Sequence, residues 1–186
     1  MSLKTTLIML VLVLLLGGWV WRDLNRIPAP DRSEGPLIQD FSKDDVIRIK
    51  IDRLEPGAQE RTTILFEKSD GTWHLRQPTQ DLADRKTVDS MLDPPFIAWA
   101  SRSAPAGLNP EKFGIGPDAP HVTFEHAHGQ SMLMLGSKSE FQQGLYVQIE
   151  GSARACLMDL DFDRPYLLPI EAYIQLKPKP QPVLQR

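Results

Sequence analysis

The stretch TTILFEKSDGTWHL, residues 62–75, decides the fold. Two runs of strand-forming residues, Thr62 to Glu67 and Thr72 to Leu75, flank the turn sequence Ser69-Asp70-Gly71. A turn signal between two such runs predicts a tight antiparallel hairpin. Trp73 is expected to lie in the core beneath this hairpin. The domain is therefore built on antiparallel sheet.

Strand patterns continue on both sides of this hairpin. From Val46 to Ile51 apolar side chains alternate with charged ones, which is the period of a half-buried strand. Two more hairpins are predicted downstream: Val122–His126 with Ser131–Leu135, and Leu145–Ile149 with Arg154–Met158. Phe66-Glu67 precedes Gly71 by the spacing that separates Phe124-Glu125 from Gly129, which either chance or a duplicated hairpin unit explains.

Short helices interrupt the strands. Asp84 is a suitable N-cap, because Val88, Met91 and Leu92 after it fall on one helical face. Pro94-Pro95 is expected to end this helix. Shorter helical turns are predicted at 109–114 and from residue 163 onward. We expect an α+β fold: an N-terminal transmembrane helix, then one small domain of antiparallel β-hairpins with one or two short helices.

The N-terminus has the composition of a membrane segment. Residues 5–21, TTLIMLVLVLLLGGWVW, carry no charge and would form a helix of about 25 Å, near the lower limit for a bilayer core. No small-residue pair suitable for a signal-peptidase cut follows it, so a retained anchor is favoured over a cleaved signal peptide. Leu7 and Leu14 belong to its apolar body, and the indole rings of Trp19 and Trp21 are expected at the membrane interface.

The layout predicted from this segment has four parts. Residues 1–26 form the anchor, 27–43 a linker rich in proline and charge, 44–176 an extracytoplasmic α+β domain, and 177–186 a proline-rich tail. Arginines after the anchor mildly oppose an outward-facing domain, whereas the short lysine-bearing start is typical of export signals. We expect a single-pass protein of the bacterial inner membrane with its C-terminal domain in the periplasm.

The amino-acid composition limits the classes of partner that the chain can bind. The chain has 186 residues, with 21 Lys or Arg and 24 Asp or Glu. Beyond residue 26 the acidic residues exceed the basic ones by five, and such a domain lacks the positive charge that nucleic acid requires. Cys156 is the single cysteine, so no internal disulfide forms; its place in a strand predicts a buried thiol. We expect no nucleic-acid partner.

Several short motifs follow one another along the chain in an order typical of a known family. They are Asp70-Gly71-Thr72-Trp73 (D-G-x-W), Ala83-Asp84 before the helix, Lys112 to Ile115 (K-F-G-I), Leu135-Gly136 (L-G) and Gly144 to Val147 (G-x-Y-V). With the anchor and the first strand they resemble the domain-of-unknown-function family numbered forty-three forty, over roughly residues 44 to 170. The early Pro94-Pro95 and the single domain copy depart from the family pattern. The resemblance implies a membrane-anchored extracytoplasmic domain, in some members beside gliding-motility-type ABC transporter components, and it implies no catalytic residues.

Candidate sites are weak in this sequence. His126 and His128 at a hairpin tip are the best metal candidates, but no third ligand has suitable spacing. Met132 and Met134 near them suggest copper, although both also fit an ordinary apolar strand. The run Asp159-x-Asp161-x-Asp163 fails as a calcium loop, so one aspartate is expected to cap the next helix. We expect no cofactor.

The motifs of common hydrolases and nucleotide enzymes are absent from the sequence, which favours a non-enzymatic protein. Trp99 has two interpretations, core or partner surface, and Gly17-Gly18 would let a second transmembrane helix approach closely. We expect an accessory or scaffold subunit of a larger inner-membrane complex, with a transporter as the candidate. The alternative is a periplasmic binding module for a small ligand, lipid or metal, which requires a pocket between the sheet and the 84–93 helix. An unrecognised hydrolase is the third hypothesis.

Overall fold

The structure, a computed structural model, describes residues 13, 16–18, 35–55, 57–98, 100, 102–104, 109–139, 143–152 and 154–175. The chain divides into two compact units, Met1–Asp31 and Arg32–Arg186. In the first unit, residues 13 and 16–18 are helical, and nothing lies within 4 Å of a Cβ built on Gly17 or Gly18. No helix among the described residues is long and apolar enough to cross a bilayer. The predicted anchor side chains of Leu7, Leu14, Trp19 and Trp21 lie outside the described residues, as does the 177–186 tail.

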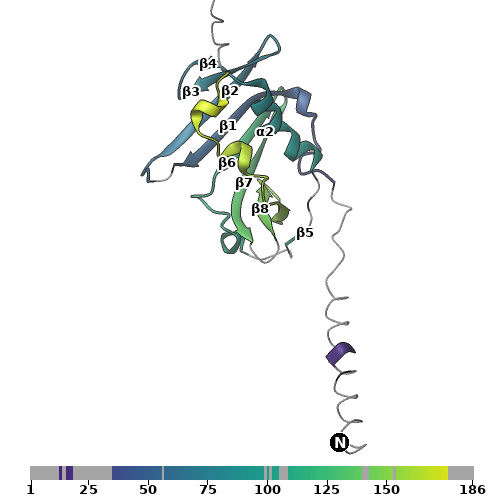
Figure 1. Cartoon of the computed structure of the whole chain (residues 1–186). Coiled ribbons are helices and arrows are strands. Elements are labelled where there is room, and N and C mark those ends of the chain that lie inside the picture. Colours follow the sequence, from purple (N-terminus) through teal and green to yellow (C-terminus); the bar gives the residue numbers. More distant parts are fainter. Residues whose placement is uncertain are drawn as a thin grey trace, which may run out of the picture. The chain divides into compact units, whose positions relative to one another are not determined.

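The second unit contains a nine-stranded antiparallel sheet in the order β4-β3-β2-β1-β6-β7-β8-β9-β5 (Figure 1). All three predicted hairpins are confirmed; the first two extend beyond their predicted bounds, whereas the second strand of the third begins at Cys156, two residues later than predicted. The strands are β1 Val46–Leu54, β2 Arg61–Ser69, β3 Thr72–Gln77, β4 Asp81–Leu82, β5 Arg102–Ser103, β6 His121–His126, β7 Gly129–Ser139, β8 Gly144–Ile149 and β9 Cys156–Asp159.

β1 lies between two similar hairpins, β2–β3 on one side and β6–β7 on the other. Ile49 pairs with Phe66 of β2 and with Phe124 of β6, and both rings are fully buried. Arg48 lies between the glutamates that follow these phenylalanines and donates to Glu67 at 3.1 Å and to Glu125 at 2.8 Å. The repeated Phe-Glu pair in the sequence therefore marks the two positions that flank the central strand.

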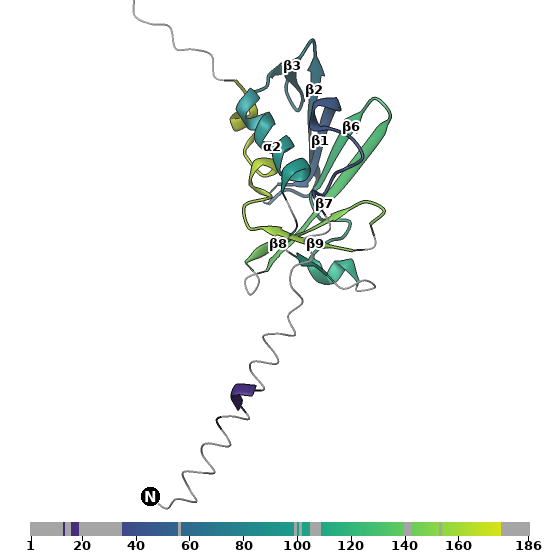
Figure 2. The ribbon, with the colours of Figure 1, turned by 90° about the vertical axis from the view of Figure 1, so that its right-hand side faces the viewer.

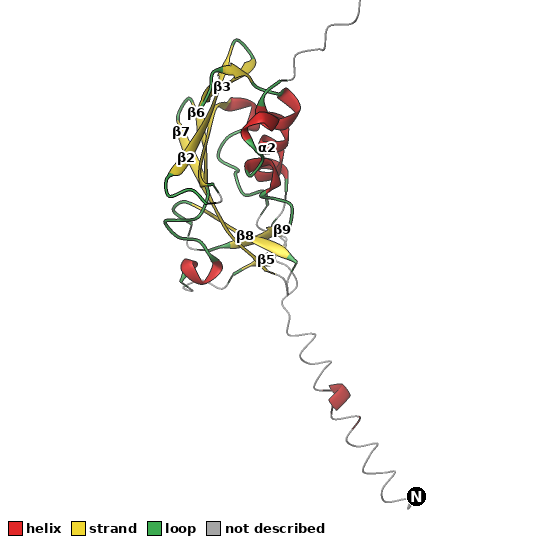
Figure 3. Cartoon of the chain, turned by 60° about the vertical axis from the view of Figure 1, so that its left-hand side comes forward, coloured by secondary structure: helices red, strands yellow, loops and turns green. Residues whose placement is uncertain are grey.

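The two faces of the sheet differ. One face carries the apolar core and is covered by α2, Arg85–Ile97, and by the short 3-10 helices η4, Arg164–Tyr166, and η5, Ile170–Tyr173 (Figure 3). The β8–β9 end of the sheet curls toward this covered face (Figure 2). The opposite face carries half-exposed charged side chains on strands β3, β2, β1 and β6, where Arg76, Glu67, Arg48 and Glu125 form one chain of ion pairs.

Part of the predicted linker packs on the domain. Ile38 is buried, its amide donates to the carbonyl of Pro95 at 3.0 Å, and Phe41 contacts the ring of Phe96. These contacts precede the 3-10 helix η2, Lys43–Asp45, which leads directly into β1. The described chain from residue 35 onward therefore belongs to the folded unit.

The prediction that Pro94-Pro95 ends the helix is wrong, because α2 continues to Ile97. Pro95 has no N–H, so it cannot donate to the carbonyl of Met91 four residues earlier. The hydroxyl of Tyr166 in η4 donates to that carbonyl instead, at 2.6 Å. Both the Tyr166 ring and Met91 are fully buried. A tertiary hydrogen bond thus satisfies the acceptor that the proline leaves open, and the helix gains its last turn.

Arg53 in β1 binds the C-terminal segment to the sheet. Its side chain is 4% exposed, and the guanidinium donates to the carbonyls of Tyr166 at 2.6 Å and Leu168 at 2.7 Å. Glu55 supplies the counter-charge at 2.7 Å. A buried arginine is expected to be paired in this way, because an unpaired buried charge is costly.

Two glycines of the K-F-G-I and L-G motifs allow η3, Pro110–Phe113, to pack closely on β7. Gly114 ends this turn at φ +70°, which favours glycine, and the Asn109 side chain caps its start. A Cβ on Gly136 would collide with the carbonyl of Phe113 and would come within 2.7 Å of Ile115 Cγ1. The predicted helical turn is confirmed, and close backbone approach explains why these positions are glycine.

Candidate functional site

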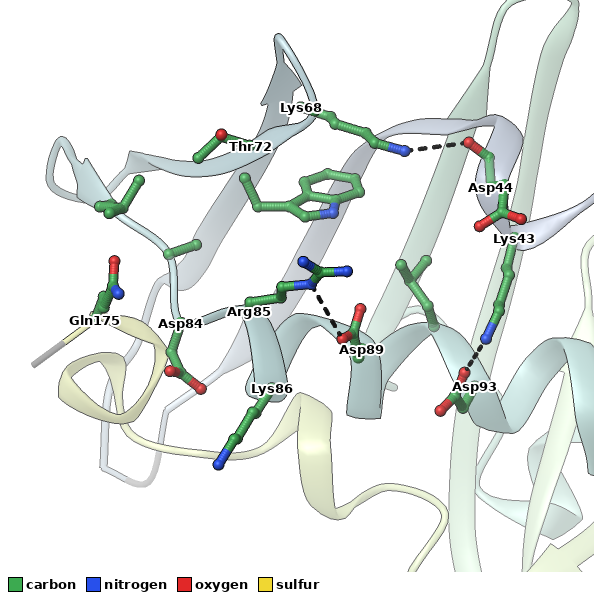
Figure 4. A pocket seen from close by; sticks show the side chains of 15 residues that line it. Lys43, Asp44, Lys68, Thr72, Asp84, Arg85, Lys86, Asp89, Asp93 and Gln175 are labelled. Carbon is green, nitrogen blue, oxygen red and sulfur yellow. Dashed lines mark hydrogen bonds and ion pairs between the residues drawn. The ribbon is translucent and has the colours of Figure 1, made fainter.

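A groove of about 720 Å³ lies between α2 and the β2–β3 hairpin (Figure 4). Such a volume is within the usual range of small-ligand sites. The groove lies where the binding-module hypothesis requires a pocket, between the sheet and the 84–93 helix. It is lined by Lys43, Asp44, Lys68, Gly71, Thr72, Trp73, Leu82, Ala83, Asp84, Arg85, Lys86, Asp89, Leu92, Asp93 and Gln175.

The hairpin wall is held by its two-residue turn. Asp70 and Gly71 both have positive φ, at 50° and 77°, which is the geometry that joins twisted strands tightly. Trp73 is 7% exposed and forms part of the core, as predicted. The Lys68 ammonium lies 5.9 Å from the centre of the Trp73 ring and donates to the carbonyl of Asp44 at 3.2 Å. The indole and the carbonyl together hold one cation at the rim of the groove.

The helical wall is fixed by a cap at its start. The carboxylate of Asp84 accepts from the amide and the hydroxyl of Thr87, both at 2.9 Å, so the predicted N-cap is confirmed. Arg85, the first residue of the helix, forms a loose ion pair at 3.7 Å with Asp89 one turn later. Their side chains are 90% and 55% exposed. Figure 4 shows both side chains on the groove side of α2, whereas Lys86 points away from the hairpin.

The two ends of the groove are closed by different elements. At one end Lys43 of η2 bridges to Asp93 of α2 at 2.7 Å, and this hydrogen bond raises the pKa of Lys43. At the other end the amide of Gln175 donates to the carbonyl of Leu82 at 2.9 Å, which adds the C-terminal segment beside β4. These contacts fix the length of the groove.

The groove retains unused hydrogen-bonding capacity. The Asp44 carboxylate is one of the charges that raise the pKa of Lys43, and Lys68 contacts a backbone carbonyl and the Trp73 indole. Arg85 and Asp89 are too far apart for a hydrogen bond. The walls therefore offer both cationic donors and carboxylate acceptors, which suits recognition of a polar ligand or a charged segment of a partner.

The fold places the predicted metal ligands His126 and His128 close together, but their rings make contacts other than those of a metal site. The rings of His126 and His128 have centroids 6.3 Å apart. His126 stacks on Phe41 at 4.0 Å, and its Nδ1 accepts from the amide of His128 at 3.4 Å. Within the described ranges, no group of three His, Cys, Asp or Glu side chains is arranged to hold a metal. The neighbouring sulfur candidates, Met132 and Met134, lie half-buried on the sheet face opposite the core.

Two other sequence candidates have specific contacts. Asp163 precedes η4 but makes no capping hydrogen bond, so the predicted cap is wrong. Its buried carboxylate pairs with Lys138 at 3.1 Å instead, because the strand ends place this lysine beside it. Cys156 is half-buried rather than fully buried, with its sulfur 3.8 Å from the Ser103 hydroxyl. Trp99, the predicted partner-surface candidate, lies outside the described residues.

The charged walls of the groove were not predicted, although the sequence contains a signal for them. Lys68 has the same strand parity as Ile64 and Phe66, so it faces the core side of β2. A lysine at a core-facing position near a strand end indicates that the face is open there. Arg53 has the same parity as Ile49 and Ile51 and gives the corresponding signal for a buried, paired cation.

Comparisons with known proteins do not extend this picture. No family model matches the chain, and no curated protein or solved structure matches it.

Proposed function

We propose that this chain is a membrane-anchored, non-enzymatic accessory subunit of a larger inner-membrane complex, with a transporter as the candidate complex. The observation that carries the proposal is the groove between α2 and the β2–β3 hairpin. Its walls hold charged groups with few contacts inside the domain: Lys68 donates to one backbone carbonyl, and Asp89 has a loose 3.7 Å pair with Arg85. Such groups contribute binding energy when a complementary surface pairs with them.

The N-terminal sequence supports the membrane part of the proposal. The uncharged run at 5–21 has the composition of a transmembrane anchor, and the following residues are rich in proline and charge. An anchor in the same bilayer as the partner raises the effective concentration of the domain toward the millimolar range. A moderate-affinity groove is then sufficient for stable assembly.

The resemblance to the forty-three forty family supports the same function. Some of its members accompany ABC transporter components. The motif residues have structural roles in this fold: Gly71 forms a hairpin turn, and Gly136 allows a close backbone contact. These roles are structural, so the motifs carry no catalytic assignment.

The test uses the full chain with a C-terminal affinity tag. Membranes are extracted with alkaline carbonate and, separately, solubilised in mild detergent, and proteins that co-purify are identified by mass spectrometry. We expect the chain to stay in the carbonate pellet and to retain integral membrane proteins. Release by carbonate, or recovery as a lone monomer, contradicts the proposal. A reporter fused after Arg186 that is active only in the cytoplasm contradicts the periplasmic placement.

Charge-reversing variants identify the surface used. Lys68→Glu changes a groove residue, and Lys112→Glu makes the same change on exposed η3, outside the groove lining. If the groove binds the partner, the first variant loses the co-purifying proteins and the second retains them. Equal retention by both variants places the partner surface elsewhere.

A second function is favoured by the concave shape of the groove: a periplasmic module that binds a small ligand. The volume of about 720 Å³ lies within the usual range of small-ligand sites. This function predicts ligand binding by the purified chain with no partner present. A titration that shows no binding removes it and leaves the accessory function intact.

A further inference from the structure

One histidine nitrogen on the open face of the sheet, the side opposite the core, lacks a partner. His121 is the first residue of β6, and its Nε2 is buried without a hydrogen bond to any residue that the structure describes. Leaving a buried polar atom unpaired costs free energy, so such atoms are nearly always bound to something. The nitrogen therefore marks a position where a ligand is expected.

Two methionines of β7 lie beside this histidine. Met134 pairs directly with His121 across the β6–β7 hairpin, and Met132 is two residues away on the same strand. The neighbouring Val122 and Leu133 are fully buried in the core, so His121 and both methionines face the other side of the sheet, away from α2 (Figure 3). The Cβ atoms of directly opposite residues are about 4.5–5.5 Å apart, and diagonal neighbours about 7–8 Å. A flexible methionine side chain spans either distance.

The sheet also decides which histidine can join the sulfurs. The sequence placed these methionines near the histidines of the hairpin tip. His126, however, has the strand parity of the buried Phe124, and its ring stacks on Phe41 at 4.0 Å on the covered side. The sheet therefore separates His126 from the thioethers, whereas His121 shares their face.

We propose that His121, Met132 and Met134 form a binding site for Cu(I). Thioether sulfurs select this soft cation, and imidazole is also a suitable ligand for copper. A water molecule would be poorly held here, because thioethers are weak hydrogen-bond acceptors. Asp52 pairs with His121 across β1 and β6, and its carboxylate lies 2.7 Å from the Lys50 ammonium, so these neighbouring charges largely cancel. The site is distinct from the groove and does not depend on it.

The test is a competition for Cu(I) between the full chain and the chromogenic chelator bicinchoninate. The chain is kept in uncharged detergent, with ascorbate and without oxygen, so that the metal stays reduced. We expect the chain to withdraw one equivalent of Cu(I) from the chelator. It should leave Zn(II) unbound, because zinc prefers imidazole, carboxylate and thiolate to thioethers. Failure to withdraw Cu(I), or equal retention of Zn(II), overturns the inference.

Variants localise the site. Met134→Leu conserves volume, which packed positions tolerate well, and is expected to weaken Cu(I) binding by at least about tenfold. His121→Gln is expected to act in the same direction. His74→Gln, half-buried on the same face in β3, and His128→Gln, at the hairpin tip, are matched controls that should bind normally. Melting temperatures monitor folding. Normal affinity in folded Met134→Leu overturns the site, and so does a loss confined to His128→Gln.

Silver(I), a redox-stable substitute for Cu(I), allows direct observation of the sulfurs by NMR. With carbon-13 in the methionine methyl groups, Ag(I) is expected to shift the signals of Met132 and Met134, which leucine variants assign. Met91 and Met158, at 0% and 1% exposure in the core, are internal controls that should not shift. Unmoved signals of Met132 and Met134 overturn the inference. Co-purification of a partner does not require the metal, so this failure is distinct from failure of the accessory function.

Discussion

The hydrogen bond from Tyr166 to the carbonyl of Met91 gives the sharpest test of this structure. Tyr166→Phe keeps the ring and removes only the hydroxyl that donates at 2.6 Å. Pro95 cannot replace this donor, so the carbonyl is left buried without a partner. An unsatisfied buried acceptor costs about 1–3 kcal/mol. For a domain of this size each kcal/mol lowers the melting temperature by roughly 2–4 °C.

A double-mutant cycle distinguishes this reasoning from a general packing effect. Pro95→Ala restores a backbone N–H four residues after Met91, which gives the carbonyl an intrahelical donor. Tyr166→Phe is then expected to cost about 1 kcal/mol less in the Pro95→Ala background than in the native chain. Urea unfolding followed by circular dichroism measures all four free energies. An identical cost in both backgrounds refutes the proposed coupling between the proline and the hydroxyl.

Three further predictions concern stability. Arg53→Met removes the donor to the buried Tyr166 carbonyl and to the part-buried Leu168 carbonyl. Urea unfolding is expected to show a loss of about 3 kcal/mol, and hydrogen exchange is expected to show faster amide exchange in η4 and η5. Burial raises the pKa of Tyr173 from 10.0 to about 12, so the unfolded chain ionises first. The contribution of Tyr173 to stability should therefore be constant below about pH 10 and fall by roughly 2–3 kcal/mol toward pH 12; a flat profile between pH 10 and pH 12 contradicts the assignment. Gly136→Ala should cost about 1–3 kcal/mol through its collision with the Phe113 carbonyl, whereas Gly116→Ala, with only an ordinary contact, should not.

The hairpins were predictable because their signals are local. Asp70-Gly71 supplies the turn, and alternation fixes which side of each strand is buried. The end of α2 was not predictable in this way. Pro94-Pro95 carries a local stop signal, but the donor that overrides it, Tyr166, is 75 residues away from Met91 in the sequence. Only the tertiary fold brings them together.

The position of the candidate site could be predicted from the sequence, but the pairing of its charged side chains could not. A pocket beside the 84–93 helix follows from an amphipathic helix on a sheet, and the groove lies there. Which charged side chains pair closely depends on distances that no spacing rule supplies. Lys43 is 50 residues from Asp93 yet bonds to it, whereas Arg85 is one helical turn from Asp89 and remains at 3.7 Å.

The contacts of Arg53 also constrain the order in which this domain is completed. Its two carbonyl acceptors lie 113 and 115 residues downstream, so they emerge from the ribosome, or from a translocation channel, long after β1 does. Until then the guanidinium must remain hydrated and the core beside it open to water. The domain therefore reaches its protease-resistant state only when the segment through Tyr173 has arrived. Nascent chains that stop short of η4 should be degraded, however complete their first hairpins are.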